Sequence, residues 1–338
     1  MKQSDLISHR LKLQHLNVLV AVAQWASMAK AAKHLGVSQP VVSKVIADLE
    51  DLLEVRLFER SPQGVEPTLY GRALLKRSIA LFDDLKTSVD EIKFLADPSA
   101  GDLRIGSTEP LFAGLVTAVI ERLWEQYPRI AFRVVQADGA TLINRDLPER
   151  RIELAVIPLL APSLREDLEV RVLYRDTLHV VAGLQSPWAR RRKITLADLT
   201  AEPWCAPPYE TPIGSLLAEA FRARGLETPR LAVASVLPPQ VIARLLESGR
   251  LLGIMADSFL HFFYPGRFAV KKLPVDLPVQ SFAVAVVTTK GRTISPVGQL
   301  FIDCAREVTR PLARRHLNSA AQPPVPLKPR ARKVRAHA

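Results

Sequence analysis

The stretch from Ala31 to Glu50 constrains the fold of this chain more than any other feature. It reads as two short helices joined by a tight turn, in which Gly36 can take the left-handed conformation that ends a helix and Ser38 can cap the next one. Pro40 falls in the first turn of that next helix, where its missing N–H is harmless. This is the helix-turn-helix arrangement, which can set one helix into the major groove of DNA.

The second of these helices, predicted over 39–53, is amphipathic. A buried stripe with a spacing of three to four residues is formed by Val42, Val45, Ile46, Leu49, Leu52 and Leu53. The opposite face is small, polar and nearly free of acidic residues, so it can approach a polyanion; it consists of Gln39, Pro40, Ser43, Lys44 and Ala47. The alternative is an ordinary solvated helix face.

The surrounding residues complete a small domain. Two further helices are predicted over 11–25 and 28–35. After the amphipathic helix, 56–60 reads as a short strand, 61–64 as a turn and 65–67 as a second strand, which together would form a wing. Phe58 is expected to close the core, and Arg60 either contacts a phosphate or a minor groove or is a plain surface charge.

A long helix follows, for which Thr68 is the expected cap and Ala96 the expected end. Its apolar seam alternates steps of three and four residues, as in a coiled coil, and comprises Leu75, Ser78, Phe82, Leu85, Val89, Ile92 and Ala96. About 28 residues at ~1.5 Å each make a rod of roughly 40 Å, which usually needs a partner to cover its stripe. We therefore expect this helix to pair with a second copy; an amphipathic helix packed on its own domain is the alternative.

Asp97–Gly101 breaks this helix and predicts a hinge, beyond which strands alternate with helices. Strands are predicted over 103–106, 131–136, 154–157, 170–174, 178–182, 231–236, 252–255 and 282–287. Helices are predicted near 111–126, 141–149, 213–224, 238–248 and 295–309. This alternation favours α/β sheets covered by helices.

Composition adds two limits. The 338 residues contain no apolar run approaching the ~20 needed to span a bilayer, no secretion signal, and two cysteines about a hundred positions apart, so a soluble cytoplasmic protein with reduced thiols is expected. The net charge of +12 is concentrated at the end, because eight Lys and Arg and no acid follow Glu307. Residues 1–98 hold thirteen Lys and Arg against twelve Asp and Glu, so the case for DNA depends on the motif rather than on bulk charge.

The run Ser38–Lys44, followed by Leu49-Glu50 and Leu57–Arg60, resembles the N-terminal signature of LysR-type transcriptional regulators, and the resemblance extends over roughly 11–310. It implies a multi-domain α+β fold with an N-terminal winged helix-turn-helix, a long linker helix and a two-lobed, periplasmic-binding-protein-like α/β domain that binds an effector. The implied boundaries are 11–67 for the DNA-binding domain, 68–97 for the linker helix, 99–312 for the effector domain (lobe I about 101–176 and 268–310, lobe II about 177–267) and 318–338 for a disordered basic tail.

The resemblance also implies residue roles at the DNA. Base contacts are assigned to Gln39, Pro40, Ser43 and Lys44, of which the Gln39 amide suits adenine and Lys44 suits guanine or a phosphate. Many family members carry arginine where Lys44 stands; lysine lacks the planar two-pronged donor that reads guanine bidentately.

Candidate effector residues follow from the places where helices start after strands. Ser107 and Thr108 match a position where the family commonly holds its effector, Thr141 lies close to a second one, and Thr211 and Val236 belong to the presumed second lobe. Several family members have Ser or Thr where Ala140 stands here. Each candidate has a plain helix cap or strand end as its alternative. A small carboxylate, an aromatic acid or a sugar could bind there.

No catalytic or metal-binding pattern was found, including GxSxG, HExxH and the P-loop, so we predict neither an enzyme nor a cofactor. The predicted function is sequence-specific regulation of transcription under a small-molecule effector. The predicted partners are double-stranded DNA, RNA polymerase and further copies of the chain, as a dimer through the linker helix and then a tetramer. Two alternatives are a ligand-binding or enzymatic α/β protein whose N-terminal helices contact a partner, and nonspecific nucleic-acid binding through the basic tail.

Overall fold

The fold is described from a computed structural model that covers 10–61, 64–160, 165–236, 238–263, 269–279 and 281–320. The chain divides into two compact units. The first unit contains Met1–Gly106, Gln126–Ala155 and Thr288–Gln299, and the second contains Ser107–Glu125, Val156–Val287 and Leu300–Ala338.

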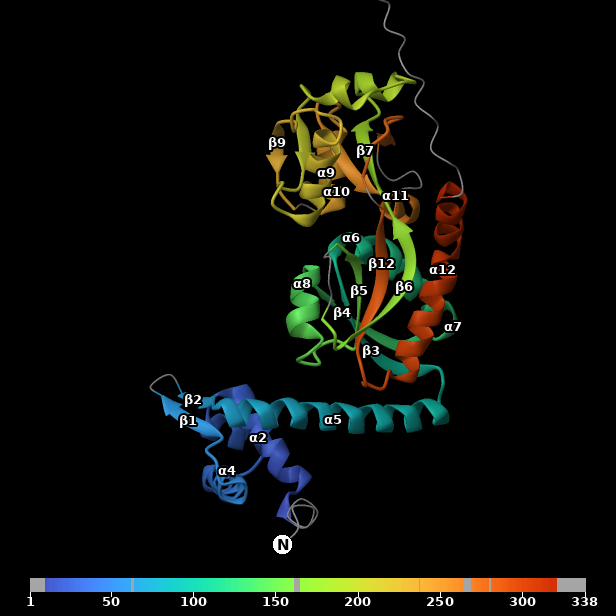
Figure 1. Cartoon of the computed structure of the whole chain (residues 1–338). Coiled ribbons are helices and arrows are strands. Elements are labelled where there is room, and N and C mark those ends of the chain that lie inside the picture. Colours follow the sequence, from blue (N-terminus) through green and yellow to red (C-terminus); the bar gives the residue numbers. More distant parts are fainter. Residues whose placement is uncertain are drawn as a thin grey trace, which may run out of the picture. The chain divides into compact units, whose positions relative to one another are not determined.

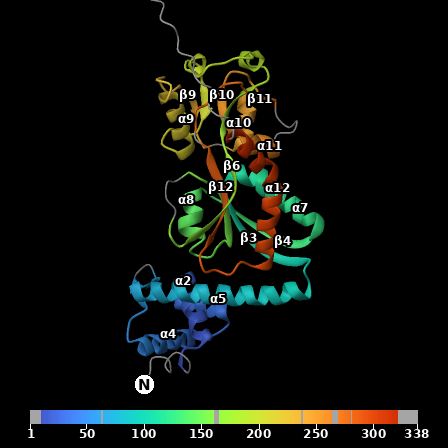
Figure 2. The same cartoon turned by 45° about the vertical axis from the view of Figure 1, so that its right-hand side comes forward.

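Three helices open the first unit: α2 (Leu13–Trp25), α3 (Met28–Leu35) and α4 (Gln39–Leu53). The helices predicted over 28–35 and 39–53 are confirmed at both ends, and the first begins two residues later than expected. Helix α2 packs against α3, α4 and the first part of the long helix that follows (Figures 1 and 2). The helix-turn-helix therefore has the order that its sequence predicts.

The turn between α3 and α4 confirms one predicted cap and corrects the other. Gly36 is left-handed, at φ 69°, and its N–H is directed at the carbonyls of Ala32 and Lys33. Ser38 occupies the cap position of α4, but its side chain makes no capping hydrogen bond, so that prediction is wrong. The physical reason is that Pro40 has no N–H to offer and the N–H of Val41 donates to the Ser38 carbonyl instead, at 3.1 Å.

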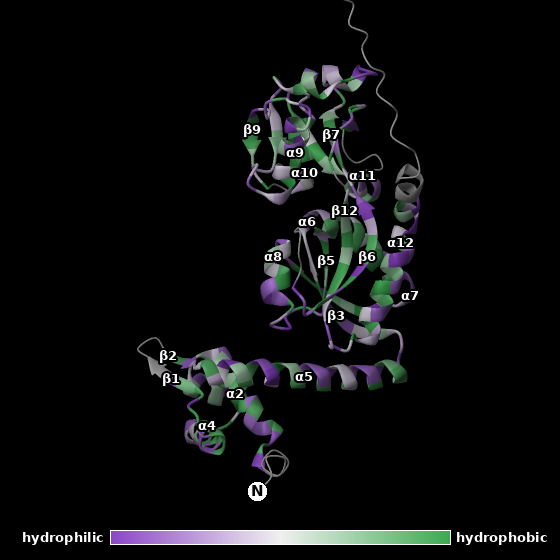
Figure 3. Ribbon diagram, in the orientation of Figure 1, coloured by the Kyte–Doolittle hydropathy of each residue, from purple (hydrophilic) through white to green (hydrophobic). Residues whose placement is uncertain are grey.

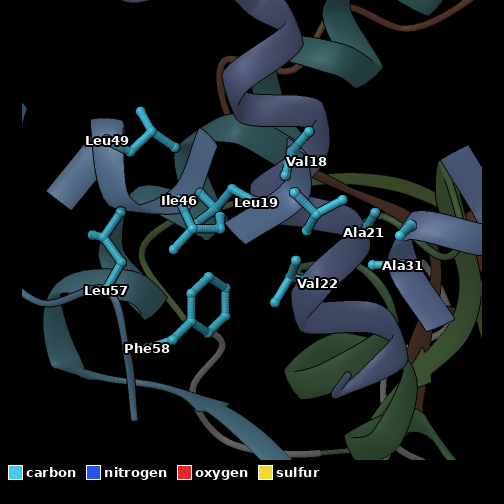
Figure 4. Close-up of a cluster of buried hydrophobic side chains, with 11 residues drawn as sticks. Val18, Leu19, Ala21, Val22, Ala31, Ile46, Leu49, Leu57 and Phe58 are labelled. Atoms are coloured by element: carbon cyan, nitrogen blue, oxygen red, sulfur yellow. The ribbon is translucent and has the colours of Figure 1, made fainter. Parts of the chain in front are cut away.

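One compact core holds these helices together. Figure 4 shows side chains of Leu19, Ile46, Leu49 and Phe58 converging from α2, α4 and the strand that follows. Ala31 is fully buried, and its small side chain lets α3 approach α2 closely. Leu53, which was expected in the buried stripe of α4, is exposed because the helix ends there and Glu54 turns left-handed, at φ 56°.

The predicted wing is present. Strands β1 (Phe58–Ser61) and β2 (Gly64–Pro67) pair antiparallel, with Phe58 opposite Pro67 and Ser61 opposite Gly64. The central turn residues, Pro62 and Gln63, lie outside the described residues. Phe58 is buried in the core, as the sequence predicts.

Helix α5 (Leu69–Ala96) begins where Thr68 accepts a hydrogen bond from the Gly71 N–H at 3.0 Å, so the predicted cap is confirmed. Figure 3 shows apolar and polar residues alternating along it. The predicted seam has two parts. Ser78 is buried in the first part, whereas Leu85, Val89 and Ile92 in the second are 49%, 42% and 68% exposed. Within the described residues, the first part of the apolar seam packs against the rest of the chain, whereas the second part is exposed to solvent.

The remainder forms two five-stranded sheets. The first has the order β4-β3-β5-β12-β6, and the second has the order β11-β7-β10-β8-β9. The strands of the first are β3 (Ala100–Ser107), β4 (Arg129–Gln136), β5 (Leu154–Leu159), β6 (Leu168–Asp176) and β12 (Phe282–Thr289). Those of the second are β7 (Leu178–Gly183), β8 (Trp204–Ala206), β9 (Leu231–Ala234), β10 (Leu252–Ala256) and β11 (Val270–Lys272). All eight predicted strands are confirmed, and β8 and β11, three residues each, were not predicted.

The helices between these strands were predicted with less detail. Those present are α6 (Glu109–Leu111), η1 (Phe112–Val116), α7 (Thr117–Gln126), α8 (Gly139–Thr141), η2 (Leu142–Asp146), η3 (Pro187–Arg190), η4 (Leu196–Leu199), α9 (Pro212–Arg222), α10 (Pro239–Leu246), α11 (Asp257–Phe263) and α12 (Pro296–Ala320). The segments η1 and η2 are π-helical, and α11 was not predicted. Helix α12 includes the first residues of the predicted tail, whose remainder, 321–338, lies outside the described residues. None of the described helices has both the length and the apolar character of a membrane span.

Candidate nucleic-acid interface and effector site

The polar face of α4 presents the predicted base-contacting side chains together. Gln39, Pro40 and Lys44 are exposed and Ser43 is half-buried. Lys44 forms no ion pair with any residue in the described part of the chain. A cation that forms no ion pair with a described residue, on the same helix as an exposed amide and a hydroxyl, is available to bind base edges or phosphates.

The contact that fixes the wing to α4 was not predicted from the sequence. Glu50, on α4, accepts hydrogen bonds from the N–H groups of Leu57 (2.7 Å) and Phe58 (3.2 Å), and its other oxygen pairs with Arg56 at 2.9 Å. The carboxylate thus satisfies two backbone donors at the start of β1 and sets the wing against the helix. Arg60 lies in β1, opposite Val65 of β2.

The start of α5 packs against the same segment, at Arg56 and Leu57. The Thr68 hydroxyl donates to the Arg56 carbonyl at 2.7 Å, and the Thr68 N–H donates to the Leu57 carbonyl at 2.9 Å. Gly71 lies so near that a Cβ added to it would meet the Leu57 oxygen at 2.0 Å. Helix α5 can therefore pack here only because this position has no side chain.

In the second unit, the turn after β3 carries two predicted effector residues. Ser107 is fully buried, and its hydroxyl is directed at the Val156 carbonyl (3.2 Å). Thr108 is half-buried and makes no capping hydrogen bond with its side chain. Glu109, which the sequence interpretation missed, accepts a hydrogen bond from the Gln240 amide of α10 at 3.5 Å. Burial raises the pKa of the Glu109 carboxyl.

Strands β8, β9 and β10 are parallel, so the residues that follow them reach one edge of the second sheet. Thr211 follows β8; its hydroxyl donates to the Pro208 carbonyl at 2.6 Å and accepts from the Gly214 N–H at 3.1 Å. Val236 follows β9 and is 71% exposed. The hydroxyl of Thr211 is thus already occupied, whereas Val236 offers only apolar surface.

Asp257 follows β10 at that edge and lies beside two basic side chains. His179 Nε2 is 2.7 Å from its carboxylate, and Lys272 Nζ lies 3.6 Å from the same oxygen and 2.8 Å from His179 Nε2. These basic groups are therefore already engaged by a carboxylate of the chain.

Thr141 belongs to the first unit. Its N–H (2.9 Å) and hydroxyl (2.6 Å) both donate to the carboxylate of Asp138, which caps α8. These hydrogen bonds lower the pKa of Asp138. Thr141 therefore fits the helix-cap alternative at least as well as ligand contact.

The two cysteines, Cys205 and Cys304, are buried and free, and burial raises the pKa of both thiols, which disfavours the reactive thiolate. No cluster of three or more potential metal ligands occurs among the described residues.

The family described as "LysR substrate binding domain" matches residues 96–310, and "Bacterial regulatory helix-turn-helix protein, lysR family" matches residues 13–72. The chain belongs to the LysR family. It is accordingly a LysR-type DNA-binding transcriptional regulator with an effector-binding domain, and the predicted fold class is confirmed.

Relatives and solved structures agree with this assignment. The LysR-type chain is 27% identical over 310 residues to the HTH-type transcriptional regulator GbpR of Azospirillum brasilense, covering 91% of this chain and 90% of that one. It is 25% identical to the regulator TdcA of Escherichia coli, covering 88% and 93%. A full-length OxyR from Pseudomonas aeruginosa shares the fold with a TM-score of 0.67 at 21% identity, covering 90% and 98%. CbnR complexed with its target DNA gives 0.50 at 21% identity, covering 88% and 100%.

Proposed function

We propose that this regulator reads its operator with Gln39, Pro40, Ser43 and Lys44, while Arg60 contacts a phosphate or the minor groove beside the wing. The observation that carries this proposal is the exposed face of α4, where an amide, a hydroxyl and a lysine without an ion pair in the described chain lie together. Selection of duplexes from a random pool by the full chain tests it. Enrichment of a half-site motif is expected, and binding without sequence enrichment would contradict it.

The finer architecture belongs to the same proposal. In this proposal the DNA-binding domain spans 11–67, the linker helix 68–97, the effector domain 99–312 and a basic tail 318–338. The regulator would act in the cytoplasm on double-stranded DNA, with RNA polymerase as a partner and a homodimer, assembling further to a tetramer, as the acting form. Paired subunits would present two recognition helices to two half-sites.

We expect the dimer to form through the exposed apolar part of α5. Replacing Leu85 and Ile92 together with lysine should raise the dimer dissociation constant at least about a hundredfold, because each apolar side chain contributes about 1.5–3 kcal/mol on burial. Sedimentation velocity measures the effect. The charge-matched control is Glu91→Lys, which changes the charge equally but lies off that stripe. An unchanged dimer in the double variant would show that α5 does not pair.

The proposed effector site favours a ligand without negative charge. Of the three ligand classes, a sugar or a similar polyhydroxylated compound therefore fits best. A carboxylate needs free N–H donors at helix starts, and Pro110, Pro212 and Pro239 remove donors from α6, α9 and α10. Glu109 places a negative charge in the first turn of α6. A hydroxyl group would instead donate to this carboxylate.

This choice of class is testable with matched compounds. Hexoses and pentoses should raise the unfolding temperature of the full chain more than the corresponding aldonic acids do; a ligand at 100 times its Kd stabilises by about 2.7 kcal/mol. Glu109→Gln should weaken sugar binding, whereas Glu121→Gln, on the exposed side of α7, should leave it unchanged. Stronger stabilisation by the aldonic acid of any pair would contradict the proposed class.

A further inference from the structure

Asp83 is a buried carboxylate in the middle of α5. The buried residues of this helix are Gly71, Ser78 and Asp83, and the Asp83 side chain is only 8% exposed. Carboxylates are almost never buried without a partner, because removal from water costs more than any apolar packing returns. An aspartate at this position therefore needs specific cationic partners.

Three arginines from three separate segments meet it, all within the first unit. Arg150, in the turn after η2, lies 2.6 Å from one Asp83 oxygen; Arg292, in the loop after β12, lies 2.8 Å from that oxygen; and Arg104, in β3, lies 3.3 Å from the other. We call these four residues the Asp83 clasp. Arg150 also reaches Asp84 at 3.0 Å, so the adjacent residue of α5 is held as well.

Arg292 is also held by a contact outside α5. The Arg292 side chain is 2% exposed and donates to the Ile152 carbonyl at 2.6 Å and to Asp83 Oδ1 at 3.0 Å. Its Nε lies 2.8 Å from Asp83 Oδ2 without the alignment of a hydrogen bond, so this contact is electrostatic. Burial is the main cause that lowers the pKa of Arg292, and the Asp83 charge opposes it.

The backbone at the clasp is held in a costly conformation. Arg150 has φ 55°, a left-handed value that an arginine rarely adopts. This residue ends the helical turn after η2, where the Arg151 N–H donates to the Asp146 carbonyl at 2.9 Å, and from this position one guanidinium reaches both Asp83 and Asp84.

We propose that the Asp83 clasp fixes the direction of α5 against the effector-binding domain and thereby sets which spacing the regulator accepts between the two DNA sites bound by the two α5-paired dimers of a tetramer. The inference rests on the proposed operator binding by α4 and on the proposed tetramer. Asp83 lies 14 residues after the start of α5, which is roughly 20 Å along the helix. A change of about 10° in the helix direction would therefore move its start by about 3.5 Å, roughly one base-pair step. Asp83 is a positioning residue, since it touches no base.

The test measures spacing preference and single-site affinity separately. A complete site selected by the wild-type chain, with both half-sites of one dimer, is placed twice on one duplex, and the separation of the two sites is varied one base pair at a time through about one helical turn of ~10 base pairs. The wild type should distinguish the best from the worst spacing by at least about tenfold, because deforming the DNA costs free energy. Full-length Asp83→Asn should lose most of this discrimination and keep its affinity for a single complete site within about twofold.

A second variant keeps the test decisive if Asp83→Asn does not fold. Arg150→Gly removes the guanidinium and also relieves the left-handed φ, so it should fold and show the same loss of spacing discrimination. The matched controls are Asp90→Asn on α5 and Arg151→Ala beside Arg150, neither of which touches Asp83. Unchanged spacing preference in folded Asp83→Asn or Arg150→Gly would overturn the inference. A loss of affinity for a single complete site would instead contradict the separation of DNA reading by α4 from positioning by Asp83.

Discussion

Replacing Gln39 and Lys44 together with alanine should weaken binding to a selected operator by roughly two to three orders of magnitude. Each good base contact is worth ~1–3 kcal/mol of discrimination, and the two side chains lie on the same exposed face of α4. Both lie on the surface, away from the buried Val42, so folding should be unaffected. Fluorescence anisotropy with the selected duplex and with a scrambled duplex, at several salt concentrations, measures the loss.

The matched control is the double variant Gln24→Ala with Lys30→Ala, which removes the same two residue types from exposed positions on α2 and α3. It should bind within about twofold of the wild type, apart from a modest change in salt dependence. If Lys44 contacts a phosphate, its loss should lower the salt slope by about one; if it contacts guanine, discrimination should fall more than the slope. Full affinity in the Gln39 and Lys44 variant would show that another surface reads the DNA.

Local sequence signals predicted most of the fold. The helix periodicity of Val42, Ile46 and Leu49 depends on neighbours within a turn or two, and so does the left-handed end at Gly36. The longer strands of the two five-stranded sheets were recognisable from their apolar runs, whereas β1 and β2 were predicted from the order of strand, turn and strand after the recognition helix. Strands β8 and β11 escaped because three residues are too few for a pattern, and their existence depends on neighbouring strands.

The contacts that fix the site could not be predicted, because they join residues far apart in sequence. Glu50 satisfies N–H groups seven and eight positions later, and Asp83 meets Arg292 across 209 positions. A carboxylate on an amphipathic helix looks like a solvated residue until its partners are placed beside it. Conversely, Thr211 occupies its hydroxyl with a cap and a carbonyl, and the sequence cannot distinguish that role from ligand contact.

Gly71→Ala should destabilise the DNA-binding domain by about 3 kcal/mol and displace the start of α5 from the wing. Alanine is the better helix former by about 1 kcal/mol, so helix propensity alone predicts the opposite sign. The added Cβ would stand 2.0 Å from the Leu57 carbonyl oxygen, which already accepts the Thr68 N–H, and 3.3 Å from the Pro67 Cβ. Backbone cannot yield as a flexible side chain does, so the helix must move. Urea unfolding and operator binding both measure the result.

Gly139→Ala provides the control, since it is the same substitution in a helical residue with no atom within 4 Å of the new Cβ. It should change stability by no more than about 0.5 kcal/mol and leave DNA binding intact. The comparison isolates contact with Leu57 from the general effect of replacing glycine in a helix. A Gly71→Ala protein as stable as the wild type would mean that α5 is not seated on the Leu57 carbonyl. The segment around Leu57 thus joins three elements: Thr68 at the start of α5 donates to the Arg56 carbonyl, and Glu50 of the recognition helix accepts from the Leu57 N–H at the start of the wing.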